Sequence, residues 1–327
     1  MSGWTIGIIG GSGLYAIDGV AGEWVDVDTP WGKPSDAIFR GTIGDVGVAF
    51  LPRHGRGHRI APGELNARAN IDALKRLGVT DVLSVSSVGG LQEERAPGSF
   101  TIVDQFIDRT QGRPSSFFGT GMVAHVSMAD PVCPRLAGMA AAAARAGGAT
   151  VHDSGTCIVM EGPQFSTRAE SNLYRNWGAH VIGMTALPEA KLCREAELPY
   201  AMVAMVTDYD CWREDEAAVD VAQVIRQLSA NSAKATAMVG HLLRALPAER
   251  TPSPIDTCLD SALITAPDAR DPALLAKLDA VAGRCRLTEN ASSAHARRAP
   301  RRRRCPARCP PEIRSSAGTA HSRSRCR

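Results

Sequence analysis

The stretch YAMVAMVTDYDCW, residues 200–212, is apolar from Tyr200 to Val206 and then becomes polar at two acids, Asp208 and Asp210. A short apolar run bounded by polar residues predicts a buried strand. The two acids are then expected where that strand leaves the core. The same pattern recurs along the chain. Its recurrence indicates the fold, and the polar residues that end each run indicate the chemistry.

Four other stretches show the same apolar run followed by small or polar residues. They are TIGIIGGSGLY (5–15), GVAFLPRHG (47–55), VTDVLSVSSVGG (79–90) and SFTIVDQFIDRT (99–110). Helical spacing of apolar residues appears between such runs at 65–78 and 221–246, and an alanine-rich stretch that ends in glycines predicts a further helix at 135–148. Strands that alternate with helices predict an α/β fold, in which ligands bind at the ends of the strands.

The chain has 327 residues, of which 44% are hydrophobic and 22% are charged, and this suits one globular domain. We expect the domain to span about 1–248, followed by an extension at 249–283 that contains a short helix. Residues 284–327 include no aromatic and almost no aliphatic side chains. They cannot form a core, so we expect an arginine-rich, disordered tail.

The net charge of +3 combines two opposite segments. Residues 284–327 carry thirteen arginines and two acids, which leaves 24 basic and 32 acidic residues in 1–283. The body is therefore an ordinary acidic domain with a charge of −8. The tail has the arginine content of a nucleic-acid-binding segment but no interleaved aromatic residues for base stacking, so nucleic acid is not the expected partner.

Nine cysteines at irregular spacing predict reduced thiols, as in a cytoplasmic protein. The N-terminus lacks the basic and apolar regions of a signal peptide, and no apolar run of about 18 residues predicts a membrane span. Cys305 and Cys309 have no second pair with zinc-ligand spacing, so no metal site is expected.

Polar residues gather at five predicted strand ends. The groups are Gly10–Gly11–Ser12–Gly13, Arg53–His54, Ser86–Ser87, Met184–Thr185 and Asp208–Tyr209–Asp210. The first four suit an anion, because a glycine turn at a helix start exposes backbone N–H groups and arginine presents a planar fork to phosphate oxygens. No GK[ST] motif accompanies them, which favours free phosphate over a nucleoside triphosphate. GGSG also lacks the G-x-G-x-x-G spacing of a dinucleotide site.

The fifth group suits a purine. Residues i and i+2 of a strand point the same way, so Asp208 and Asp210 are expected to face one pocket. Two carboxyl groups this close do not easily both ionise, so one is expected to hold a proton. A protonated acid donates to a ring nitrogen and a charged one accepts from an exocyclic amine. Adenine offers that pair at N7 and N6.

The chain resembles the methylthioadenosine phosphorylase branch of the trimeric purine nucleoside phosphorylase family. The matching segments are IGIIGGSGL (6–14), GKPSDA (32–37), RHGRGH (53–58), DQFIDRT (104–110), EGPQFSTRAE (161–170), GMTALPEA (183–190) and TDYDCW (207–212). The resemblance implies a single α/β domain with a central mixed, twisted sheet flanked by helices. It also implies a phosphate-dependent pentosyltransferase that needs no metal or organic cofactor and forms a homotrimer.

The resemblance further implies a role for each matching residue. Those expected to hold phosphate are Ser12, Arg53, His54, Ser86, Ser87 and Thr185. Those expected to contact the nucleoside are Phe165 on the purine, Met184 on the ribose, Asp208, Tyr209 and Asp210 at the base, and Val224 and Ile225 at the 5′-methylthio group, with His125 reaching in from a neighbouring subunit. Ser166 and Val221 are expected to set specificity, and Asp208 and Asp210 to be catalytic.

Three alternatives remain open from the sequence. A broad purine nucleoside or methylthioinosine phosphorylase differs in its base or 5′ preference, and a nucleosidase uses water in place of phosphate. A nucleic-acid-binding protein would depend on the tail and not on the strand ends.

Overall fold

The computed structural model describes residues 3–11, 20–213 and 221–285, without the side chains of 221–225. The chain divides into two units after Arg286, and every described residue belongs to the first. The second unit, Leu287–Arg327, lies outside the described residues, and so does almost all of the tail expected to be disordered.

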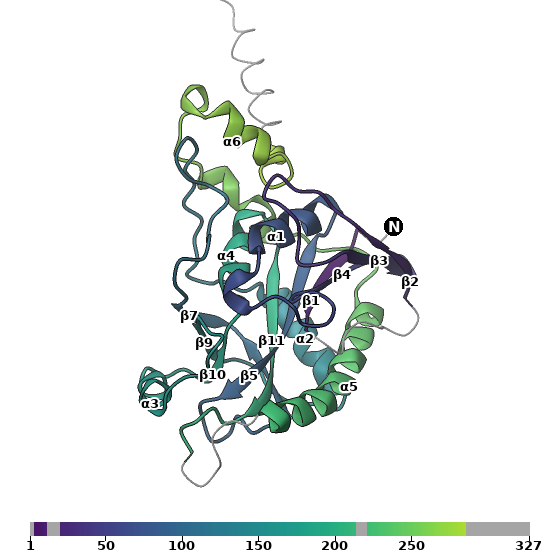
Figure 1. Ribbon diagram of the computed structural model, residues 1–327. Coiled ribbons are helices and arrows are strands. Elements are labelled where there is room, and N and C mark those ends of the chain that lie inside the picture. The colour runs from purple at the N-terminus through teal and green to yellow at the C-terminus, as the bar shows by residue number, and fades with distance from the viewer. Residues whose placement is uncertain (1–2, 12–19, 214–220, 286–327) are drawn as a thin grey trace, which may run out of the picture. The chain divides into compact units, whose positions relative to one another are not determined.

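The described strands form one mixed sheet (Figure 1). They are β1 (Thr5–Gly10), β2 (Ala21–Val25), β3 (Ile38–Ile43), β4 (Val46–Pro52), β5 (Asp81–Gly90), β6 (Ser99–Val103), β7 (Gln105–Arg109), β8 (Thr150–His152), β9 (Thr156–Met160), β10 (Val181–Gly183) and β11 (Tyr200–Asp208). Their order is β2-β3-β4-β1-β5-β10-β9-β7, while β11 lies between β5 and β6, and β8 pairs with β6. Parallel and antiparallel pairs both occur, which confirms the expected mixed sheet.

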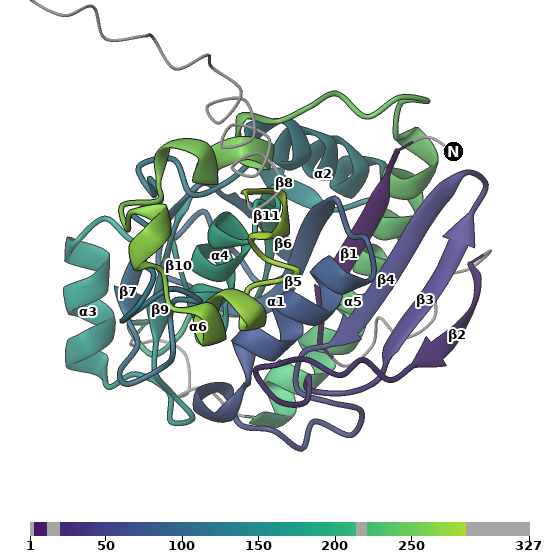
Figure 2. The same cartoon turned by 90° about the horizontal axis from the view of Figure 1, so that it is seen from above.

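Helices cover the sheet on both faces. They are α1 (Ala67–Arg76), α2 (Pro134–Ala146), α3 (Arg168–Asn176), α4 (Ala186–Glu195), α5 (Val221–Ala245) and α6 (Pro272–Lys277), with short 3₁₀ helices η1 (Pro62–Glu64), η2 (Pro254–Ser261) and η3 (Pro267–Ala269). In Figure 2, α1 and α4 lie on one side of the central strands, and α2 and α5 on the other. This arrangement confirms the predicted α/β domain, and the helices α1, α2 and α5 lie where the sequence predicted them.

The central strand β11 explains how two cores form around one sheet. Its apolar residues alternate between the faces: Met202, Ala204 and Val206 pack with α1 and α4, whereas Ala201, Val203 and Met205 pack with α2 and α5. A strand buried on both faces must be apolar at every position, which is why 200–206 reads as an unbroken apolar run.

The extension after residue 248 contributes to the same compact unit. Leu259 in η2 and Leu278 after α6 are fully buried in the core cluster that includes α1 and α4. The packed chain continues through Arg284, whose guanidinium donates to Glu197, and Cys285, which is 4% exposed. No described helix has both the length and the apolar character needed to cross a membrane.

Candidate active site

The sheet opens beside β5. Strand β1 pairs with β5 only as far as Ser84, and β10 begins to pair with it at Gly89. Between these points, Val85 to Val88 pair with β11 on the other edge. Ser87 is the one exposed residue of this otherwise buried strand. Solvent therefore reaches the middle of the sheet at Ser87, which is one of the residues predicted to hold phosphate.

Arg53 closes one end of this opening. Its backbone N–H donates to Gly10 O at 2.9 Å, which places it where β4 and β1 end. Its guanidinium, in a residue only 2% exposed, donates to Ile9 O at 3.2 Å, Val85 O at 3.1 Å and Ser84 Oγ at 2.7 Å. Arg53 therefore satisfies backbone carbonyls at the point where β1 and β5 separate.

The expected two-point fork between Arg53 and phosphate is not free in this structure. Nε and one Nη2 hydrogen bond pair Arg53 with Glu189, and the other Nη2 contacts are Ile9 O and Ser84 Oγ. A guanidinium has five N–H groups, so with Val85 O on Nη1 a single Nη1 N–H is left to face an anion. Glu189 was not identified from the sequence.

His54 lies next to Arg53 and is neutral. Its Nδ1 lies 2.9 Å from Ile60 O, and because a carbonyl can only accept, Nδ1 carries the hydrogen. Burial lowers the pKa of His54 to about 4, with the neighbouring Arg53 acting in the same direction. Its ring stacks on His58 at 4.2 Å between centroids. At neutral pH, Nε2 is therefore an acceptor.

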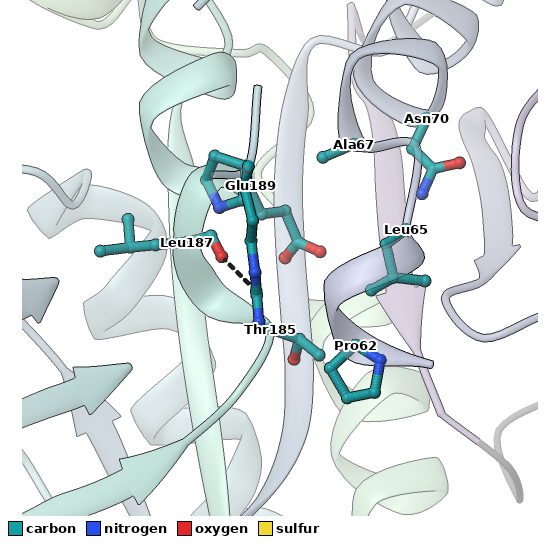
Figure 3. Close-up of a pocket in the computed structure, with 9 residues that line it drawn as sticks. Pro62, Leu65, Ala67, Asn70, Thr185, Leu187 and Glu189 are labelled. Carbon is teal, nitrogen blue, oxygen red and sulfur yellow. Dashed lines mark hydrogen bonds between the residues drawn. The ribbon is translucent and has the colours of Figure 1, made fainter. Parts of the chain in front are cut away.

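The other predicted phosphate residues surround the opening unevenly. Ser86 Oγ is buried and has no hydrogen-bond partner among the described residues, whereas Ser87 is exposed. Thr185 is partly exposed at the start of α4. It lines a pocket between Pro62, Leu65 and Ala67 on one side and Leu187 and Glu189 on the other (Figure 3). Ser12 lies outside the described residues.

The two acids are brought together by a turn. Strand β11 ends at Asp208, and Asp210 has a left-handed backbone with φ of 55°. The prediction that both acids lie on one strand was therefore wrong, because Asp210 lies in the turn that follows the strand. Instead, the backbone N–H of Asp210 donates to Asp208 Oδ1 at 2.8 Å, and Thr207 Oγ1 donates to Asp208 Oδ2 at 2.7 Å.

Gly89 leaves the space in which these acids sit. A Cβ atom at Gly89 would lie 3.1 Å from Asp208 Oδ1, 3.3 Å from Asp210 Cβ and 3.0 Å from Ile182 Cγ2. Ordinary side chains do not tolerate contacts this close to several atoms at once. The acid pair thus packs directly against the backbone of β5 at Gly89.

The segment 161–167 joins the acids from a distant part of the sequence. Ser166 Oγ donates to Asp210 Oδ2 at 2.7 Å, and both residues are buried. Phe165 is 49% exposed, which suits a ring that is to be covered by a ligand. A Cβ at Gly162 would lie 2.5 Å from Met184 Sδ, so Met184 packs directly on this segment.

Arg113 is a further residue that sequence reasoning missed. Nη1 donates to Met184 O at 2.6 Å and Leu187 O at 3.0 Å, while Nε and Nη2 bond the carboxylate and the backbone carbonyl of Glu161. It therefore ties the Met184–Thr185 turn to the segment that carries Phe165. A single arginine in a loop gives no periodic signal, so only the fold reveals it.

Some predicted residues are not joined to this group. The hydroxyl of Tyr209 donates to Glu93 O at 3.2 Å, and its ring packs edge-on against Trp212. His125 is exposed, and its backbone N–H donates to Ala262 O. Among the described residues, no hydrogen bond or ring contact links His125 to the acids. The side chains of Val221, Val224 and Ile225 lie outside the described residues.

The register of β5 and β11 sets the size of the site. Ser86 lies opposite Ala204, and Gly89 lies opposite Asp208. Ser87 and Gly89 are two strand positions apart, which is roughly 7 Å. Ser87 is therefore separated from the position of the acids at Gly89 by roughly 7 Å, whereas the Arg53 guanidinium bonds Val85 O and lies further along β5.

One group among the described residues has metal-ligand spacing. Ligand atoms of Glu197, Asp260 and Cys285 lie within 4.8 Å of one another. The guanidinium of Arg284 donates to both carboxylates, at 2.5 Å and 2.7 Å. An arginine thus already supplies the positive charge at this cluster.

Comparison with known proteins places the chain among nucleoside-cleaving enzymes. Residues 5–244 match the Phosphorylase superfamily. The S-methyl-5′-thioadenosine phosphorylase of Cereibacter sphaeroides is 60% identical over 282 residues, which cover 85% of this chain and 97% of that protein. The protein of the same name from Bradyrhizobium diazoefficiens is 58% identical over 283 residues, with coverage of 86% and 97%.

Solved structures give the same result. A methylthioadenosine phosphorylase from an Antarctic soil metagenomic library matches with a TM-score of 0.81 at 45% identity, over 86% of this chain and 99% of that one. The methylthioadenosine phosphorylase of Schistosoma mansoni in complex with adenine matches with a TM-score of 0.70 at 38% identity, over 73% and 91% of the two chains.

Proposed function

Because the chain belongs to the phosphorylase superfamily, we propose that it splits S-methyl-5′-thioadenosine with phosphate into adenine and 5-methylthioribose 1-phosphate. It is a phosphate-dependent pentosyltransferase of purine and methionine salvage. The observation that carries this proposal is the register of β5 and β11. It places the exposed hydroxyl of Ser87, a hydrogen-bond donor for an anion, two positions from Gly89, against which the acid pair packs. No metal or organic cofactor takes part in the proposed reaction.

In the proposed reaction, phosphate and the acids act on opposite sides of the bond that is broken. A phosphate oxygen attacks C1′ while the C1′–N9 bond breaks, and the bonding electron pair moves onto the purine. Hydrogen bonds from Ser12, Ser86, Ser87, Thr185 and the remaining N–H of Arg53 hold phosphate, and Nε2 of neutral His54 contacts it only by accepting a hydrogen bond from a phosphate hydroxyl. Holding the nucleophile in place removes the entropic cost of a bimolecular encounter.

The acids act on the leaving base. Asp208 donates a proton toward N7 and neutralises the negative charge that develops on the purine. Asp210 accepts from the N6 amine, and the hydrogen bond from Ser166 supports that role because it fixes Oδ2 of Asp210. Phe165 stacks on the purine and Met184 lies against the ribose.

The 5′ end of the substrate is assigned from the family resemblance. Val221, Val224 and Ile225 form an apolar surface for the methylthio group, and Val221 together with Ser166 sets specificity. His125 completes the site of a neighbouring subunit in a homotrimer, and its exposure in the single chain is compatible with that role. The enzyme acts in the cytoplasm.

One assay tests the proposal. Base release is measured with methylthioadenosine, adenosine, methylthioinosine and inosine, each with and without phosphate. We expect phosphate-dependent release that is fastest with methylthioadenosine. Preference for inosine would contradict the assignment of the acids to a 6-amino base, and release without phosphate would indicate a nucleosidase.

A further inference from the structure

The guanidinium of Arg53 is paired with a single buried acid. Nε lies 3.0 Å from Glu189 Oε2 and Nη2 lies 3.3 Å from Glu189 Oε1. Arg53 is 2% exposed and Glu189 is 5% exposed. Two parallel bonds between a guanidinium and a carboxylate fix both the position and the plane of the arginine.

Glu189 is itself held in place. The hydroxyl of Tyr200, at the start of β11, donates to Glu189 Oε1 at 3.0 Å, and Tyr200 is 1% exposed. Burial, followed by the charge of Glu189, raises the pKa of Tyr200 well above its usual value, so the phenol keeps its hydrogen. The chain of contacts therefore runs from Tyr200 through Glu189 to Arg53.

Glu189 also connects two parts of the proposed phosphate site. Glu189 lies in the first turn of α4, four positions after Thr185. Both residues line the pocket in Figure 3. Arg53 comes from the end of β4, 136 positions earlier in the chain. A shift of Glu189 would thus change the position of Arg53 relative to Thr185.

We propose that Glu189 is a positioning residue for phosphate: it holds the guanidinium of Arg53 so that the remaining Nη1 N–H stays beside Val85, where the sheet opens. Tyr200 orients Glu189 for this task. The inference rests on the proposed function, because it requires that phosphate bind at this opening. Neither residue touches the substrate.

The test measures KM for phosphate and KM for methylthioadenosine separately in Glu189→Gln and Tyr200→Phe. Removing a hydrogen bond to a charged group typically weakens binding about tenfold, so we expect KM for phosphate to rise about 10-fold in Glu189→Gln and less in Tyr200→Phe. KM for the nucleoside should change less than about twofold, because the acid pair does not contact Glu189. If Glu189 had only a structural role, its replacement would change KM for phosphate and KM for the nucleoside to a similar extent.

Glu195→Gln is the matched control. Glu195 lies on the same helix, is 6% exposed, and accepts from Ser116 Oγ and Phe117 N instead of Arg53. We expect its loss to lower stability and leave KM for phosphate unchanged. If Glu189→Gln folds poorly, the rise in melting temperature on adding phosphate is compared among the variants, since that rise reports phosphate binding to the folded state.

Arg53→Lys distinguishes an error in the positioning role of Glu189 from an error in the location of the phosphate site. If this variant raises KM for phosphate while Glu189→Gln and Tyr200→Phe do not, the positioning role is wrong and the proposed phosphate site stands. If Arg53→Lys also leaves KM for phosphate unchanged, the phosphate site itself is misplaced and the positioning role falls with it.

Discussion

The hydroxyl of Ser166 lies 2.7 Å from Oδ2 of Asp210, although the two residues are 44 positions apart in the chain. Both are buried, and Asp210 sits in a left-handed turn that also donates its N–H to Asp208. The acid pair is therefore held from two directions, by its own turn and by the segment that carries Phe165. Several of the expected effects of mutation depend on this arrangement.

Ser166→Ala should lower turnover on methylthioadenosine about 10-fold, because Asp210 would lose a hydrogen bond that fixes its carboxylate. KM for phosphate should stay within about twofold of the wild-type value, since the change is remote from Arg53. Steady-state kinetics with each substrate varied in turn checks this. Ser99→Ala is the control, because that hydroxyl is also buried but donates to Ala96 O. Equal losses in both variants would argue against a role at the base.

Asp208→Asn should lower turnover on 6-amino nucleosides by about 100-fold, because it removes the proposed proton donor to N7. Phosphate binding should be preserved, and the rise in melting temperature with phosphate measures it independently of turnover. Unchanged turnover in this variant would remove Asp208 from the mechanism.

Gly89→Ala should misplace both acids, because its Cβ would lie 3.1 Å from Asp208 Oδ1 and 3.3 Å from Asp210 Cβ. We expect overpacking to lower stability by about 1–3 kcal/mol. Turnover per folded molecule should also fall, because the acids are displaced. Gly138→Ala on α2 is the control, since no atom lies within 4 Å of its added Cβ. That change should stabilise the helix by roughly 0.5–1 kcal/mol. Unfolding in urea and kinetics measure both effects.

His54 should make stability fall as the pH is lowered from about 6.5 to about 4. Its pKa in the folded protein is about 4, below the ordinary value of 6.5, so between these values the unfolded state binds more protons. The full contribution, at most about 3 kcal/mol, is present above the unfolded pKa and is lost below the folded one.

His54→Asn keeps a donor near Ile60 O and removes the titration. Unfolding free energies of the two proteins, measured across this range, should therefore converge as the pH falls. Histidines that do not touch His54 contribute equally to both proteins and cancel in the difference, whereas His58, whose ring stacks on His54, is replaced in a parallel pair of variants. Parallel curves would mean that His54 titrates normally in the folded protein.

Ending the chain after Arg286 should preserve activity, because it retains every described residue. Ending it after Gly283 should cost at least about 2 kcal/mol, because Glu197, 3% exposed at its side chain, loses its bonds to Arg284. Thermal unfolding and the base-release assay distinguish the two. Loss of activity in the longer form would implicate Leu287–Arg327 in function.

Much of the fold could be predicted because its signals are local. The apolar run at 200–206 and the helical spacing at 65–78 each depend on neighbours a few residues away, and both elements occur where they were expected. The strands β2 and β3 were not predicted: β2 lies at the edge of the sheet and is exposed at four of its five residues, and β3 beside it is mostly only partly buried. The predicted strand ends also indicated the candidate site residues, because that edge of an α/β sheet is where ligands bind.

The site was predicted less completely, for a physical reason. The sequence alone determined an α/β fold and the residue types at its strand ends, because side-chain periodicity is set by the 3.6- and 2-residue repeats of helix and strand. Only the tertiary structure decided that Glu189 takes most of the Arg53 fork, that Ser166 holds Asp210, and that the sheet opens between Val85 and Val88. Those contacts join segments far apart in the chain, and strand register and helix packing determine them, which no local pattern encodes.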